Sequence, residues 1–281
     1  MLALFDRVIN NLKTSASGSR RIKCQSFFST SIKIMPSIMS VDTNSSDYSY
    51  WSEIYEKQEP IVFKGLLSQN SKSQWPALSP SLSDRFWSLE NLKKRCGGEM
   101  VTVEAFGDYM DPKMEQVDIY FEDFVSFIES KGSMHMYLAQ QDLEAVHHSL
   151  VQDIIEPAIC KTGKGVLYRR NIWLGPGNIA SPCHYDPFQN MLCQVIGRKR
   201  VIVFAPTSSN TQSLYPCVGT LQMNTSSVDI SNPNLIKFPL FKNAIGLECI
   251  LEPGDALFIP LKHWHYCKSL EASCSVNFWW L

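Results

Sequence analysis

The spacing of apolar residues changes near residue 169. Upstream, most apolar positions recur with the period of a helix, between polar loops. Downstream, short apolar or alternating runs are separated by glycine and proline, as is typical of β-strands and turns. The pattern predicts helices over 48–57, 88–97, 118–130 and 142–159, the last broken near Pro157, and strands over 60–65, 100–105 and 136–140. Further strands are predicted over 171–174, 190–195, 199–205, 249–251, 256–259 and 273–280.

Two glycine turns are predicted to close β-hairpins. Gly197-Arg198 lies between 190–195 and 199–205, and Pro253-Gly254-Asp255 separates 249–251 from 256–259. Many short strands at even spacing are typical of a closed or double-sheet barrel such as a jelly roll. Because the helices cluster upstream, the expected fold is mainly β with N-terminal helices (α+β). We expect one domain over 46–281, with its barrel core at about 169–281.

Residues 1–45 differ in composition from the rest of the chain. Lysine and arginine outnumber acidic residues there, serines are frequent, and the first dozen residues are amphipathic. This composition is typical of a mitochondrial transit peptide and equally of a disordered tail. The two interpretations imply a mitochondrial protein and a protein of the cytoplasm or nucleus, respectively.

Overall composition excludes several classes of function. The 281 residues are 44% hydrophobic and 19% charged with a net charge of -1, so no broad nucleic-acid-binding surface is indicated. No apolar run approaches the ~20 residues of a membrane span. Nine cysteines form no C-x-x-C pair, which favours reduced thiols over disulfides or a cysteine-rich zinc site.

Candidate metal chemistry lies in the segment S-P-C-H-Y-D-P-F-Q-N. His184 and Asp186 alternate, so an extended strand would point both side chains to one face. A third ligand is expected from a distant strand, and His265 in L-K-H-W-H-Y fits; His263 has the same parity but lies less deep in the strand. Two histidines and one carboxylate are the ligand set of non-haem Fe(II) oxygenases.

Lys199 is the candidate partner for an acidic cosubstrate. Oxygenases of this kind commonly take two electrons from 2-oxoglutarate, whose remote carboxylate needs a cation. Lys199 follows Asp186 by thirteen residues, on the next predicted strand, while Arg198 and Arg200 have the opposite parity and should face outward. A charge-assisted hydrogen bond from lysine is worth roughly 1.5–3 kcal/mol.

Several motifs together resemble one known family. H-Y-D-P-F-Q-N with G-R-K, then N-P-N-L-I-K-F-P-L-F, L-E-P-G-D-A-L-F-I-P-L-K-H-W-H-Y and S-V-N-F-W-W occur in this order. They resemble the Jumonji-C (JmjC) family of Fe(II)- and 2-oxoglutarate-dependent oxygenases, most closely its branch of small hydroxylases. The resemblance runs from about residue 60 to 281 and is strongest from residue 171.

The resemblance implies a double-stranded β-helix with Fe(II) on His184, Asp186 and His265, and O2 as the second substrate. It places Lys199 on the C5 carboxylate of 2-oxoglutarate. It also implies that Gln140 lines the substrate cleft and that Trp173 and the Trp279-Trp280 pair lie near the pocket. Further polar residues are implied to hold the cosubstrate: Tyr137, Ser181, Asn190 and, through a second-shell bond, Asn277.

The expected activity is hydroxylation of an arginine or lysine side chain in a protein or peptide, by a monomer. The motif N-P-N-L-I-K-F-P-L-F also resembles the wybutosine hydroxylases of the family, which makes tRNA an alternative partner. N-methyl-lysine demethylation uses the same chemistry and is a third alternative. A cupin-like binding module without turnover is the alternative from a different class.

Overall fold

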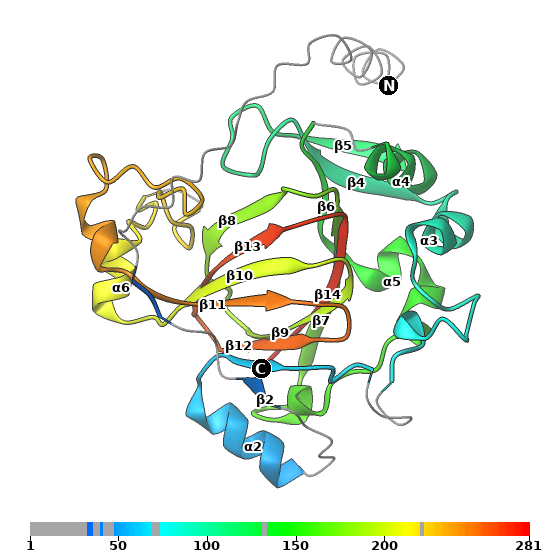
Figure 1. Cartoon of the computed structure of the whole chain (residues 1–281), viewed down its shortest axis with the longest axis horizontal. Helices are drawn as coiled ribbons and strands as arrows, with labels where there is room; N and C mark the ends of the chain where they lie inside the picture. The colour runs from blue at the N-terminus through cyan, green and yellow to red at the C-terminus, as the bar shows by residue number, and fades with distance from the viewer. Residues whose placement is uncertain (1–32, 36–39, 42–47, 69–73, 131–133, 220–221) are drawn as a thin grey trace. The chain divides into compact units, whose positions relative to one another are not determined.

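The computed structural model describes residues 33–35, 40–41, 48–68, 74–130, 134–219 and 222–281. Their strands form two sheets (Figure 1). The smaller sheet has the order β1 (Lys33–Met35), β11 (Ile245–Leu251), β10 (Lys199–Phe204), β13 (Trp264–Ser269) and β8 (Ala180–His184). The larger has the order β2 (Ser40–Val41), β3 (Ile61–Phe63), β12 (Ala256–Ile259), β9 (Gln189–Ile196), β14 (Ser273–Trp280), β7 (Leu167–Gly175), β6 (Met136–Asp142), β4 (Met100–Ala105) and β5 (Glu115–Tyr120).

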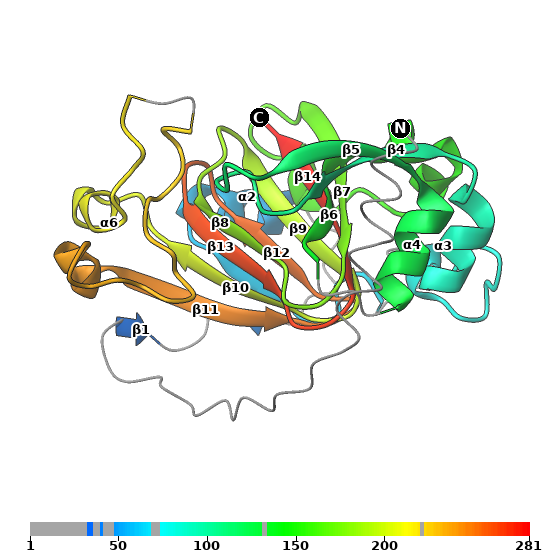
Figure 2. The same ribbon diagram turned by 90° about the horizontal axis from the view of Figure 1, so that it is seen from above.

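The chain crosses repeatedly between the two sheets, and this makes the barrel a jelly roll. β9, β12 and β14 belong to the larger sheet, whereas β8, β10, β11 and β13 belong to the smaller one. The predicted fold class, a β jelly roll with N-terminal helices, is therefore confirmed (Figures 1 and 2).

Both predicted hairpins are wrong. β9 pairs with β12 and β14 rather than with β10, and β11 pairs with β10 rather than with β12. Gly197 and Gly254 do adopt positive φ in tight turns, but these turns are corners that carry the chain from one sheet to the other. Local turn chemistry specifies that the chain reverses, whereas the pairing partner is set by packing of the two sheets.

Strand β10 shows how the barrel interior is built. Val201 and Val203 pack between the sheets with Leu192, Leu257 and Ile259. The intervening side chains, Ile202 and Phe204, face the other way and pack with Leu214 and with apolar residues between 228 and 244. Since Lys199 has the parity of the inward valines, it points into the barrel, and Arg200 lies outside in an ion pair with Glu248.

Helices and short 3-10 turns flank the barrel. Figures 1 and 2 show α3 and α4 beside β4 and β5, with α6 on the opposite side. The helices are α2 (Tyr48–Lys57), α3 (Leu89–Cys96), α4 (Phe121–Glu129), α5 (Leu143–Val146) and α6 (Ser208–Ser213), and the 3-10 turns are η1 (Pro76–Leu78), η2 (His148–Asp153), η3 (Ala158–Lys161) and η4 (Pro239–Asn243). Ser88 caps α3, since its side chain accepts a bond from the Asn91 backbone N–H.

Two predicted helices need correction. Residues 118–120 belong to β5, because they pair with β4, and the helix begins only at Phe121. The predicted helix over 142–159 is divided into α5, η2 and an extended stretch before η3. His147, in extended conformation, ends α5, and its ring caps the next turn by accepting from the Ser149 N–H.

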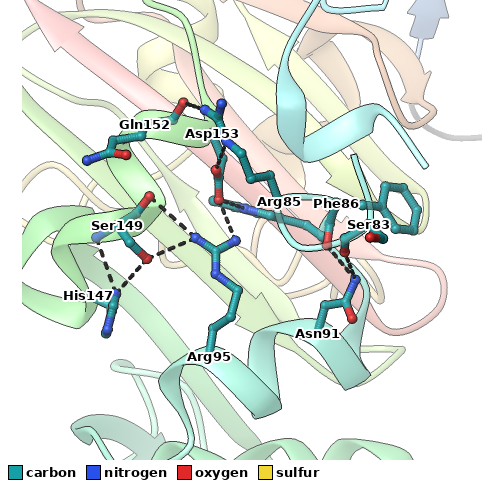
Figure 3. Close-up of polar contacts among 10 residues, drawn as sticks. Ser83, Arg85, Phe86, Asn91, Arg95, His147, Ser149, Gln152 and Asp153 are labelled. Carbon is teal, nitrogen blue, oxygen red and sulfur yellow. Dashed lines mark hydrogen bonds and ion pairs between the residues drawn. The ribbon is translucent and has the colours of Figure 1, made fainter. Parts of the chain in front are cut away.

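A buried carboxylate ties α3 to η2. Asp153, 1% exposed, accepts bonds from Arg85 Nε (2.8 Å), Trp87 Nε1 (2.9 Å) and Arg95 (2.6 Å). Figure 3 shows the two arginines converging on it, with Arg95 also donating to Ser149. Because two cations and an indole N–H satisfy Asp153, its burial without water is tolerated.

The N-terminal segment is described only in part. β1 and β2 fall inside the 1–45 segment that the sequence assigns to a tail or transit peptide, and they pair with β11 and β3. The remainder of that segment, including the amphipathic start, lies outside the described residues. No helix in the described ranges has the length and apolarity required to cross a membrane.

Candidate metal and cosubstrate site

The two candidate histidine ligands come from adjacent strands. β8 and β13 pair antiparallel, with His184 directly opposite His265. Their ring centroids are 4.4 Å apart. The register shifts immediately after His265, before Cys267. The pairing therefore brings together two residues that are 81 positions apart in the sequence.

Backbone carbonyls fix the orientation of both rings. His184 Nδ1 bonds to the carbonyl of Pro182 (2.8 Å), and His265 Nδ1 bonds to the carbonyl of His263 (3.0 Å). A carbonyl only accepts, so each Nδ1 must donate, and each Nε2 presents a lone pair. This is the arrangement that metal-ligating histidines adopt in proteins.

Asp186 completes the cluster just past the end of β8. Its carboxylate oxygens lie 3.7 Å from His184 Nε2 and 3.6 Å from His265 Nε2. These separations are too long for hydrogen bonds. Ligand atoms from the three residues lie within 4.8 Å of one another, and the donor set suits a non-haem Fe(II) ion.

Burial prepares His265 to act as a neutral ligand. Desolvation first, and then the neighbouring His184, lower the pKa of His265 to about 4. At neutral pH the His265 imidazole is therefore already neutral, and it can bind a metal without first losing a proton. His263, the alternative ligand, lies outside the three-residue cluster and bonds weakly to the Leu261 carbonyl (3.5 Å).

The predicted cosubstrate residues surround a small pocket next to these ligands. All five lie in its wall together with the three ligands: Tyr137, Ser181, Asn190, Lys199 and Asn277. Tyr137 and Ser181 share a side-chain hydrogen bond, which places two hydroxyls together. The structure thus brings together, from β6 to β14, every residue that the resemblance implied for the cosubstrate.

Lys199 is the cation of this pocket. Its side chain is 2% exposed, and within the described ranges no carboxylate lies at ion-pair distance from its Nζ. Burial lowers its pKa, although the Cys267 and Cys274 thiols partly oppose this shift. A buried ammonium group without a counterion is costly. The carboxylate of a bound dicarboxylic acid such as 2-oxoglutarate would provide that counterion, so the charge and the polar lining of the pocket suit the cosubstrate.

Asn190 contacts the metal-site carboxylate, and Asn277 in turn contacts Asn190. Asn190 Nδ2 donates to Asp186 Oδ2 (3.1 Å), and Asn277 Nδ2 donates to Asn190 Oδ1 (3.0 Å). Asn190 therefore bonds to Asp186 directly, Asn277 reaches it only through Asn190, and both amides line the small pocket.

A larger cavity of about 310 Å³ opens beyond the ligands. Gln140, expected in the substrate cleft, and Trp173, expected near the pocket, line it, whereas Trp279 and Trp280 pack in the core. The cavity also has wall residues that the sequence did not indicate, because they lie on a strand face and two distant loops: Glu104, Asp108, Tyr109, Gln222, Asn224 and Thr225. The alternation of apolar and polar residues over Met100–Ala105 predicted the strand that carries Glu104. It did not predict that Glu104 would line this cavity.

Two of these wall residues join the loops over His184. Tyr109 and Thr225 hydroxyls are 3.3 Å apart, and the Tyr109 ring meets His184 edge-on at 6.3 Å. Burial and then Asp108 raise the pKa of Glu104 to about 7. The carboxyl groups of Glu104 and Asp108 make this part of the wall acidic, which favours a cationic occupant.

Comparison with known proteins agrees with this geometry. The cupin-like domain model matches residues 48–281. Lysine-specific demethylase 8 of Danio rerio is 38% identical over 235 residues, covering 82% of this chain and 55% of that protein. Jumonji C domain-containing protein 5 of Drosophila melanogaster is 34% identical over 220 residues, covering 75% of this chain and 53% of that protein.

A more distant relative is named for a different function. The tRNA wybutosine-synthesizing protein 5 of Gallus gallus is 24% identical over 247 residues, covering 81% of this chain and 72% of that protein. The chain belongs to the cupin-like JmjC family. It spans about half the length of the Danio rerio and Drosophila melanogaster relatives.

Proposed function

We propose that this protein is an Fe(II)- and 2-oxoglutarate-dependent oxygenase that hydroxylates an arginine or lysine side chain of a protein. The observation that carries the proposal is the position of Lys199. A buried ammonium group with no carboxylate partner among the described residues lines the same small pocket as His184, Asp186 and His265. A metal-binding module alone has no use for that cation.

The chain's own groups would divide the work as follows. His184, Asp186 and His265 would hold Fe(II) on one face, leaving the other face open to ligands. Lys199, with the Tyr137 and Ser181 hydroxyls, would hold the remote carboxylate of 2-oxoglutarate. When bound, the iron and 2-oxoglutarate supply the oxidising chemistry with O2, releasing succinate and CO2.

The acidic cavity supports a cationic substrate side chain. Glu104 and Asp108 lie in its wall, and burial first and Asp108 second raise the pKa of Glu104, so a nearby cation would favour its charged form. Trp173 and Tyr109 add aromatic faces, which attract guanidinium and ammonium groups. Relatives named as lysine-specific demethylases support a basic substrate.

The chemical outcome is tested with matched peptides. Unmodified arginine or lysine peptides should gain the mass of one oxygen atom in a reaction that requires 2-oxoglutarate. If only N-methylated peptides react, with release of formaldehyde, the protein is a demethylase and our proposal of stable hydroxylation fails.

The likeness to the wybutosine-synthesizing protein supports tRNA as a second candidate substrate, since that relative is covered over most of its length. Adding tRNA to the same assay separates a tRNA substrate from a protein substrate. If tRNA is the substrate, its nucleosides gain mass and every peptide stays unchanged. Binding of iron and 2-oxoglutarate without succinate from any substrate would favour a binding module.

A further inference from the structure

A continuous run of hydrogen bonds links the wall of the larger cavity to the metal-site carboxylate. Trp173 Nε1 donates to Asn277 Oδ1 (2.9 Å), Asn277 donates to Asn190 (3.0 Å), and Asn190 donates to Asp186 (3.1 Å). Asn171 Nδ2 also donates to Asn277 Oδ1 (3.1 Å). We call the four residues Trp173, Asn277, Asn190 and Asp186 the amide relay.

The relay follows the sheet from strand to strand. Trp173 lies on β7, Asn277 on β14 and Asn190 on β9, which are neighbours in the larger sheet. Asn277 is paired directly with Asn171 and Leu192, so Trp173 and Asn190 are its diagonal neighbours. Diagonal positions on one sheet face are within reach of long side chains.

The chemistry of the two ends fixes the direction of every bond between them. The Asp186 carboxylate only accepts, so Asn190 must turn its NH2 toward it and its oxygen toward Asn277. Asn277 must then present its own NH2 to Asn190. Its oxygen consequently faces Trp173, and an indole N–H only donates. Neither amide can flip without opposing two like groups, so the relay has one stable arrangement.

Burial makes a broken link costly. Asn277 is 1% exposed and Asn190 is 5% exposed, so water is a poor substitute for a lost partner. Trp173, in contrast, is half-buried and lines both the small pocket and the larger cavity. The relay therefore connects a residue that a substrate would touch to a residue that a metal would bind.

We propose that Asn277 and Trp173 are positioning residues, which orient Asp186 for metal binding through the amide relay and couple the substrate wall to the metal site. This inference rests on the proposed function for the identity of the metal, but its test does not depend on turnover. The probe is Co(II), titrated anaerobically without 2-oxoglutarate, with affinity and visible absorption spectrum as readouts.

Two variants break the relay at different links. Asn277→Leu removes the central amide and should weaken Co(II) binding about 10- to 100-fold, as loss of an outer-shell partner does. Trp173→Phe keeps an aromatic wall but removes one neutral donor, so a loss of about 2- to 10-fold is expected. Both should change the Co(II) spectrum.

Ser275→Ala is the matched control, two residues before Asn277 on β14. It removes one buried hydrogen bond, to Gln194 Oε1 (2.7 Å), but none from the relay, so Co(II) affinity and spectrum should stay as in the wild type. The double variant separates coupling from simple packing. With Asn277→Leu already present, Trp173→Phe should cause no further loss, because the indole is already disconnected.

Unchanged Co(II) affinity and spectrum in Trp173→Phe would overturn the inference, even if Asn277→Leu failed to fold. Additive losses in the double variant would overturn the coupling. If the predicted order of Co(II) affinities is found but wild-type protein with iron never consumes 2-oxoglutarate, the relay stands and the proposed oxygenase function fails.

Discussion

His184 and His265 occupy facing positions on β8 and β13, and each bonds through Nδ1 to the carbonyl two residues before it. The same local bond on both strands turns both Nε2 atoms toward Asp186. The orientation of the site is thus set by short-range backbone geometry, while its assembly is set by strand pairing. Each histidine can be tested separately from the fold that carries it.

Replacement of His265 by asparagine should abolish tight metal binding. It removes one of three ligands, so the loss in Co(II) affinity should exceed the about 100-fold that outer-shell changes cause. The matched control is His263→Asn, two residues away and also buried but outside the cluster. Equal losses in the two variants would show that burial near the site, rather than ligation, determines binding.

Replacement of Lys199 by methionine should weaken cosubstrate binding and stabilise the fold. Loss of a charge-assisted bond predicts about 10- to 150-fold weaker 2-oxoglutarate affinity. The thermal midpoint of the ligand-free protein should rise, because an apolar side chain replaces a buried ammonium group. Arg200→Met is the control, since Arg200 faces away toward Glu248. A destabilised Lys199→Met protein with unchanged affinity would contradict this account.

Capture of a cationic peptide should depend on pH through Glu104. Its pKa of about 7 lies above the ordinary value of 4.5, so the folded protein holds this proton more tightly than the unfolded chain does. Deprotonation as pH rises through about 7 therefore costs stability, and a bound cation offsets that cost. Peptide affinity should rise across this range, and Glu104→Gln should abolish the rise. A wild-type profile identical to that of Glu104→Gln would exclude this role.

The ion network of Figure 3 should affect stability without affecting the site. Asp153→Ala leaves Arg95, Arg85 and the Trp87 indole without their acceptor, which predicts a loss of about 3 kcal/mol in the free energy of unfolding, measured by denaturant titration. Arg85→Met should cost less than about 1 kcal/mol, because that side chain is 42% exposed. No residue of this network lines either pocket, so the folded fraction should retain wild-type Co(II) affinity.

Residue alternation and turn chemistry predicted most strands but not how they pair. The strands around Gly197 and Gly254 lie where they were expected, yet both turns proved to be corners between sheets. The local pattern likewise predicts a helix that includes Asp118–Tyr120, and only the pairing of these residues with β4 shows that they form a strand. Such information depends on contacts between distant segments, which a local pattern does not contain.

The candidate site was more predictable than the pairing, because its chemistry requires specific residue types. His184, Asp186 and Lys199 lie within one short stretch, and strand parity together with the family resemblance pointed Lys199 inward. Glu104 and Tyr109 could not be predicted in the same way, because a strand and a loop bring them to the cavity from far upstream. The role of Trp173 as a donor to Asn277 depends on a diagonal contact that only the register shows.

Succinate formation is the measurement that tests the central claim most directly. Purified protein is incubated with Fe(II), 2-oxoglutarate and O2, with and without arginine and lysine peptides, beside the Asp186→Ala variant. We predict succinate from the wild-type protein, increased by one class of peptide, and none above background from Asp186→Ala. Equal succinate from both proteins, or none from wild-type protein that has bound iron, would contradict the account.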